Sequence, residues 1–213
     1  MGNVQAYISP GAIDSQNVVV DPTSDVSVTP EPKLIIPKLN IDVPVVYGVG
    51  ADDKAQLAAM EHGVAHWPGG EQAKSVPGQA GNTVIAGHSS NDLFESGDYK
   101  FIFSQLDRLE EGDTIYVNYE GKRYTYSVTK KDIILPKGQW QSIITQTDKP
   151  MLVLVTCWPL GTAQKRLLVS AEQVSPDPTA VKPATPSTDA VETTDGMTGT
   201  SPTFFEWLFG LFS

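Results

Sequence analysis

The chain has 213 residues and a formal net charge of −10, which is enough chain for one good-sized domain with flanking tails. Most of the excess acidity lies near the two ends: residues 33–175 hold 16 acids against 14 bases, so this central part is nearly neutral. A nearly neutral domain without a basic stripe argues against nucleic acid as a partner. A single cysteine excludes an internal disulfide and a multi-thiolate metal site.

Residues 1–32 are predicted to be a flexible N-terminal stalk, because four prolines are set among Ser, Thr and Asp. Residues 33–175 follow as the predicted folded domain. A helix is predicted from Asp52 to Met60, where an acidic start precedes good helix formers, and a short helical stretch over residues 99–109. The predicted strands lie at residues 34–39, 41–47, 83–88, 114–119, 122–128, 132–135, 151–157 and 164–172. Many short strands with few helices predict a mostly-β fold, a closed or nearly closed barrel with one or two short helices.

Residues 176–203 are rich in Pro and Thr and are predicted to be a disordered linker. Residues 204–213 form a hydrophobic C-terminal tail that is too short to span a bilayer, since spanning takes about twenty residues. We favour the interpretation that the tail is the stub of a truncated membrane anchor. The alternatives are an aromatic interfacial anchor and a tail that folds back on the barrel.

The only cysteine, Cys157, ends a run of aliphatic residues that is typical of a buried strand. Pro159 and Gly161 follow it and predict a turn that opens the chain to solvent, so an exposed thiol is placed for chemistry. The alternative is a small buried hydrophobe, which is the usual role of a single cysteine.

Two further polar residues lie at predicted strand edges. His88 ends the run G-N-T-V-I-A-G-H, and the small residues around it favour an exposed ring. Arg166 begins the next strand after Cys157. A histidine can exchange protons with a thiol, and an arginine can stabilise an oxyanion or hold a peptide backbone. The alternative for His88 is a ring that is hydrogen-bonded to backbone groups. The alternative for Arg166 is a surface arginine at the start of an edge strand.

The segments V-T-C at residues 155–157, R-L-L-V at 166–169 and G-N-T-V-I-A-G-H at 81–88 resemble the signature of the sortases, cysteine transpeptidases of Gram-positive-type cell surfaces. The family pattern is T-L-x-T-C, and Val153 replaces its first threonine. The resemblance spans roughly residues 33–174. It implies an eight-stranded sortase-type β-barrel with His88, Cys157 and Arg166 as catalytic residues.

Two residues beside the cysteine are candidates for substrate binding. Thr156 can lend its amide or hydroxyl to the oxyanion or the peptide, or it is simply a β-branched core residue. Trp158 can line the substrate groove or cap the barrel. No metal site is predicted: His62 and His66 lack a third ligand at a recognisable spacing, and His66 is expected to be structural or at the rim of the cleft. No cofactor is expected, because the acid pairs that suggest calcium are explained by a helix start and a charged turn.

The resemblance implies an extracytoplasmic enzyme that is anchored to the cell membrane in its full-length form. Its partners would be surface proteins with an L-P-x-T-G-like sorting signal and an amine acceptor on the cell wall or a pilin. The alternatives are a cysteine hydrolase that releases the acyl group to water and a non-catalytic barrel that binds peptides. Some pilus-building relatives carry an N-terminal lid with an Asp-Pro-aromatic motif; here Thr23 follows Asp21-Pro22, so we favour a stalk.

Overall fold

The computed structural model describes residues 28–69, 73–90, 98–136, 144 and 147–178. The predicted linker and hydrophobic tail, and most of the predicted stalk, lie outside these residues. The elements follow one another along the chain as β1 (Lys33–Ile36), η2 (Pro37–Leu39), β2 (Ile41–Val46), α1 (Asp53–Met60), β3 (Val64–His66), β4 (Gly81–Ala86), η3 (Leu106–Arg108), β5 (Thr114–Tyr119), β6 (Lys122–Ile134), β7 (Pro150–Trp158) and β8 (Lys165–Ser175).

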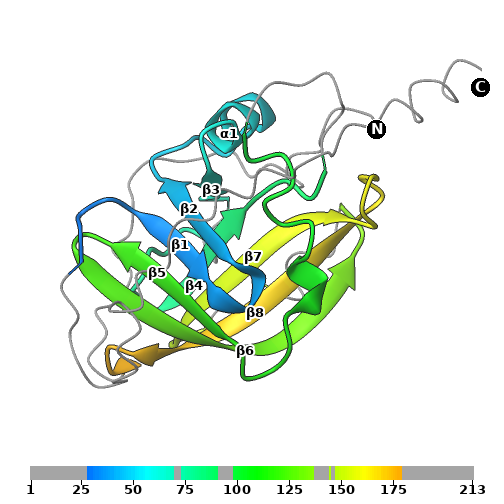
Figure 1. The fold of residues 1–213 in the computed structure, drawn as a ribbon. Helices are drawn as coiled ribbons and strands as arrows, with labels where there is room; N and C mark the ends of the chain where they lie inside the picture. Colours follow the sequence, from blue (N-terminus) through cyan, green and yellow to red (C-terminus); the bar gives the residue numbers. More distant parts are fainter. Residues whose placement is uncertain (1–27, 70–72, 91–97, 137–143, 145–146, 179–213) are drawn as a thin grey trace, which may run out of the picture.

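The strands form a closed barrel in the order β1-β2-β3-β4-β7-β8-β6-β5, with β5 returning to β1 (Figure 1). This confirms the predicted mostly-β, closed eight-stranded architecture. Two neighbouring pairs are parallel, β2 with β3 and β4 with β7, and the other pairs are antiparallel. The helices within the described ranges are all too short or too polar to cross a lipid bilayer.

Strand β7 separates two groups of buried side chains. Leu152 and Leu154 belong to the core inside the barrel, whereas Val153 and Val155 belong to a second apolar cluster on its outer face. Successive side chains of a strand point to opposite faces, so burial on both faces requires an unbroken aliphatic run. The outer cluster also contains Ala59 and Met60 of α1, the helix that Figure 1 shows beside β3.

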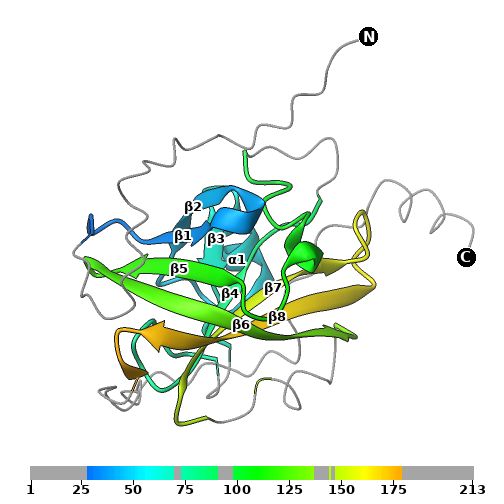
Figure 2. The same cartoon turned by 60° about the horizontal axis from the view of Figure 1, so that its bottom comes forward.

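The segment between β4 and β5 closes one end of the barrel with Phe103, Leu106 and Leu109, which are all buried in the core. The prediction of a helical stretch over residues 99–109 is corrected here: the segment is a series of turns with a single short 3-10 element. Several of its backbone hydrogen bonds run from an amide to the carbonyl three residues earlier, for example from Leu106 to Phe103 and from Leu109 to Leu106. A period of three residues per turn aligns the three apolar side chains, which lie three residues apart, on one face. Figure 2 shows this segment in green beside β8.

Other local predictions hold with small changes. Asp52 caps α1, since its carboxylate accepts a hydrogen bond from the Ala55 amide at 3.0 Å. Glu120 and Gly121 both adopt left-handed backbone angles, as a two-residue hairpin turn between β5 and β6 requires.

The predicted strands at residues 122–128 and 132–135 are parts of one bulged strand, β6. The short strand β3 was not predicted, because three residues carry too little periodicity.

The last residues of the predicted stalk that the structure describes contact the barrel. The Val28 amide donates a hydrogen bond to the Gly121 carbonyl, and the Pro32 carbonyl accepts one from the Val45 amide. The boundary at residue 32 stays a prediction.

His66 on β3 is buried, and its Nε2 lies 3.0 Å from the Ser75 carbonyl oxygen. Its ring packs against Tyr47, with the ring centroids 5.0 Å apart. Burial lowers the pKa of His66 below its usual value of 6.5, although the hydrogen bond to Ser75 opposes this shift. His66 therefore serves the fold as a neutral buried group.

This lowered pKa predicts a loss of stability as the pH falls. The unfolded chain binds a proton at His66 more readily than the folded chain does, so the stabilisation is complete above about pH 6.5 and decreases below it. We expect His66→Gln, which keeps an N–H donor, to show a smaller drop in its urea midpoint between pH 7.5 and 5.5 than the wild type. The exposed His62→Gln is the matched control and should behave like the wild type. An equal drop in His66→Gln and the wild type would contradict the assignment.

Candidate active site

The candidate site lies at one edge of the barrel, where β4 and β7 end together. The two strands are parallel, and their register runs from Gly81 opposite Pro150 to Ala86 opposite Val155. One residue further, the Gly87 amide still donates to the Val155 carbonyl at 3.1 Å. Continuing this register by two residues from Ala86 and Val155 brings His88 alongside Cys157.

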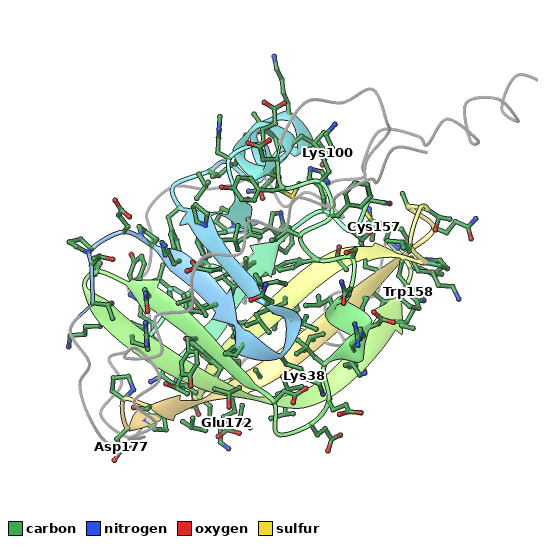
Figure 3. All side chains as sticks on the ribbon, viewed as in Figure 1. Lys38, Lys100, Cys157, Trp158, Glu172 and Asp177 are labelled. Atoms are coloured by element: carbon green, nitrogen blue, oxygen red, sulfur yellow. The ribbon has the colours of Figure 1, made fainter. Side chains whose placement is uncertain are left out.

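Strand β8 brings the third residue. It runs antiparallel to β7, and the register pairs Arg166 directly with Cys157. The three sequence-predicted residues His88, Cys157 and Arg166 therefore lie on three neighbouring stretches of chain at one barrel edge. In Figure 3, Cys157 and Trp158 lie at one end of the barrel, and Glu172 and Asp177 lie at the other.

Side-chain alternation places these residues on the outer face of the barrel. Cys157 follows Val153 and Val155 at intervals of two, and Arg166 precedes Leu168 by two, all on the face of the outer cluster. Trp158 has the opposite orientation and packs against the inner core. The nucleophile candidate therefore lies where the apolar outer face reaches the end of the barrel.

The exposure of the site differs from the prediction. Cys157 is 6% exposed, His88 5% and Arg166 3%, so neither the Cys157 thiol nor the His88 ring has the exposure that the flanking turn and small residues suggested. The reason is tertiary: the turns over residues 98–109 and the β7–β8 connection pack around the strand ends. The Phe103 amide donates to the His88 carbonyl at 2.9 Å, and the Gly161 amide to the Ser90 hydroxyl at 2.9 Å.

Arg166 is held from its own side of the site. Its Nη1 donates to the carbonyl oxygens of Ala163 at 2.9 Å and Lys165 at 3.0 Å. These two bonds fix the plane of the guanidinium group, whose charge persists at any physiological pH. The alternative of a surface arginine is wrong for Arg166, because this residue is buried.

Gly87, which precedes His88, has a role that the sequence did not reveal. A Cβ atom at this position would lie 2.7 Å from Phe103 Cδ2 and 3.1 Å from Val64 Cγ1. Because the Phe103 ring is buried in the core, it cannot easily move away. A glycine is therefore required here by close packing, and the packing fixes the backbone that carries His88.

Thr156 connects the two parallel strand ends. Its side chain is buried, and its hydroxyl donates to the Gly87 carbonyl at 2.8 Å. This hydrogen bond holds Gly87, which precedes His88, beside Thr156, which precedes Cys157. Thr156 and Trp158 also line a small hollow at the barrel end, together with Cys157 and Leu160.

Within the part of the chain that the structure describes, no group of three or more His, Cys, Asp or Glu side chains is arranged to hold a metal ion. The acid pair Asp52-Asp53 forms the start of α1. In the second acidic stretch, Glu110 and Asp113 form ion pairs with Lys38 at 2.7 and 2.8 Å.

The sequence and the barrel correspond to a known family. The sortase-domain family profile matches residues 34–174. The chain belongs to the sortase family.

Individual relatives agree with this assignment. The chain is 30% identical over 145 residues to sortase D of Bacillus subtilis (strain 168), which covers 67% of this chain and 63% of that protein. The chain thus spans somewhat less than two thirds of the length of this relative. The structure of sortase A from Corynebacterium diphtheriae matches with a TM-score of 0.54 and 25% identity over 73% of this chain and 64% of that one. Sortase C-1 from Actinomyces oris matches with a TM-score of 0.54 and 24% identity over 68% of this chain and 75% of that one, a likeness of fold.

The hydrogen bond between Thr156 and Gly87 predicts a cost for its removal. Thr156→Val keeps the shape of the side chain but leaves the Gly87 carbonyl without this donor, so we expect a loss of about 1–3 kcal/mol in the free energy of unfolding. The matched control is Thr162→Val, whose hydroxyl donates to the Pro159 carbonyl in a partly exposed turn and should cost less than about 1 kcal/mol. Urea unfolding of both variants measures the difference. Equal costs would mean that the bond does not fasten the strand ends.

Proposed function

We propose that this protein is an extracytoplasmic, membrane-anchored sortase-type cysteine transpeptidase with Cys157 as its nucleophile. The observation that carries the proposal is the convergence of His88, Cys157 and Arg166 at one barrel edge, on β8 and at the ends of β4 and β7. Family membership supports the same chemistry, because sortases are cysteine transpeptidases. The substrates would be surface proteins with an L-P-x-T-G-like signal and an amine on the cell wall or a pilin.

In the proposed reaction the Cys157 thiolate attacks the carbonyl carbon of the scissile peptide bond. The carbon–sulfur bond forms, the carbon–nitrogen bond breaks, and His88 gives a proton to the leaving amine. Arg166 stabilises the oxyanion or holds the substrate backbone. The thioester then reacts with a second nucleophile. The low exposure of Cys157 limits the access of water and so favours transfer to an amine over hydrolysis.

The first test looks for the thioester. The protein is incubated with a panel of sorting-signal peptides, with and without an amine, and analysed by mass spectrometry. We expect an acyl adduct on Cys157 that Cys157→Ala abolishes, and an amide product when the amine is present. An acid product alone would identify a hydrolase. Absence of any adduct, together with a thiol that reagents label only after denaturation, would favour a peptide-binding barrel.

The second test concerns Arg166. Arg166→Lys keeps the charge but loses the planar fork, and a lysine cannot both hold the carbonyls of residues 163 and 165 and present donors to the substrate. We expect kcat/KM to fall at least tenfold, about 1.4 kcal/mol of barrier, with both limbs of a bell-shaped pH profile left in place. Arg123→Lys, on the distant β5–β6 hairpin, is the matched control and should stay within twofold. A displaced limb of the pH profile, or near-wild-type activity in Arg166→Lys, would show that Arg166 has another role.

A further inference from the structure

A hydrogen bond connects the chain that follows His88 to the turn between β7 and β8. The Ser90 hydroxyl oxygen accepts this bond from the Gly161 amide at 2.9 Å, although the two residues are 71 positions apart in the sequence. The turn joins β7, which carries Cys157, to β8, which carries Arg166. One bond thus links the chain that carries the first of the three proposed catalytic residues to the turn between the other two.

The β7–β8 turn has a defined shape of its own. The amide and the hydroxyl of Thr162 both donate to the Pro159 carbonyl at 3.0 Å. Gly161 has a backbone φ of +81°, which lies in the left-handed region that glycine adopts without strain. A Cβ atom at Gly161 would meet no atom within 4 Å, so the backbone angle, and not crowding, favours glycine here. The Gly161 amide is therefore presented to Ser90 by a turn whose internal hydrogen bonds do not involve Ser90.

The backbone at His88 is anchored by three other hydrogen bonds. The Gly87 amide donates to the Val155 carbonyl at 3.1 Å, and the Thr156 hydroxyl donates to the Gly87 carbonyl at 2.8 Å. The His88 carbonyl accepts a bond from the Phe103 amide at 2.9 Å. These three bonds attach His88 to β7 and to the turns that close the barrel, but none of the three reaches the β7–β8 turn.

Ser90 differs from these anchors in its exposure. It is half-buried, whereas Thr156 and Phe103 are buried, and its bond to Gly161 lies at the surface. A side chain at the surface can be replaced with little loss of global stability. The effect of the Ser90 bond on the reaction can therefore be measured separately from its effect on folding.

We infer that Ser90 is a positioning residue, which holds His88 in register with Cys157 and Arg166 while the thioester forms. This inference rests on the proposed transpeptidase function and names a residue that supports its three proposed catalytic residues. Proton transfer from His88 to the leaving amine requires hydrogen-bond reach, and a displacement of about 1 Å can slow such a reaction by about a hundredfold. Without the Ser90 bond, the β7–β8 turn and the chain after His88 move independently, so the aligned arrangement is populated less.

The test measures thioester formation in single turnovers, with a sorting-signal peptide that acylates the wild type. We expect Ser90→Ala to lower the acylation rate at saturating peptide by about fivefold or more, because the reacting groups lose their alignment. The peptide concentration that gives half of this rate should change by less than about twofold, because Ser90 is not expected to touch the peptide. Ser90→Thr keeps the hydroxyl and should retain at least about half of the wild-type rate.

The matched control removes a bond of the same kind far from the site. The Thr147 hydroxyl accepts a hydrogen bond from the Lys149 amide at 3.1 Å, just before β7 begins at Pro150. Thr147→Ala therefore deletes an exposed hydroxyl acceptor of a backbone amide at the opposite end of β7 from Cys157. Its acylation rate should stay within about twofold of the wild-type rate.

A second measurement reports on the bond itself and needs no substrate. In Ser90→Ala the Gly161 amide, followed by NMR, should exchange its hydrogen with solvent about threefold faster or more, while the urea midpoint stays near that of the wild type.

The outcomes separate this inference from the function on which it rests. A wild-type protein that forms no thioester with any sorting-signal peptide overturns the proposed function, and this inference with it. A thioester that forms in Ser90→Ala at the wild-type rate overturns the positioning role alone. Equal losses in Ser90→Ala and Ser90→Thr, or an unchanged exchange rate of the Gly161 amide, would also overturn it, because the effect would then not depend on the hydroxyl bond.

Discussion

The parallel pairing of β4 with β7 is the constraint on which the site depends. Parallel strands end at the same edge of a sheet, so two segments about seventy residues apart in sequence deliver His88 and Cys157 to one place. The antiparallel return of β8 then sets Arg166 opposite Cys157. Hydrogen bonds extend this order beyond the regular ladder, from the Gly87 amide to Val155 and from the Thr156 hydroxyl to Gly87. The relative position of His88, Cys157 and Arg166 thus follows from backbone pairing.

The same strands explain why the site is nearly buried. β7 has apolar partners on both of its faces, with the barrel core inside and the cluster beneath α1 outside. The turns over residues 98–109 close the barrel end with Phe103 and Leu106, and Phe103 packs directly on Gly87. In these surroundings the Cys157 thiol is shielded from water, which would suit the thioester of the proposed reaction.

The sequence by itself determined the barrel class, the strand that ends in Cys157 and the three polar residues at strand edges, because these rest on local periodicity and on motifs that a linear pattern preserves. It did not determine β3, the single bulged strand β6 or the turns over residues 98–109, since short or irregular elements are selected by the core that they complete. The low exposure of His88 and Cys157 and the hydrogen bond of the Thr156 hydroxyl were decided only by the tertiary structure. Each depends on which distant segment packs beside the residue, and that is set by strand order and closure of the barrel, which neighbouring residues in the chain do not encode.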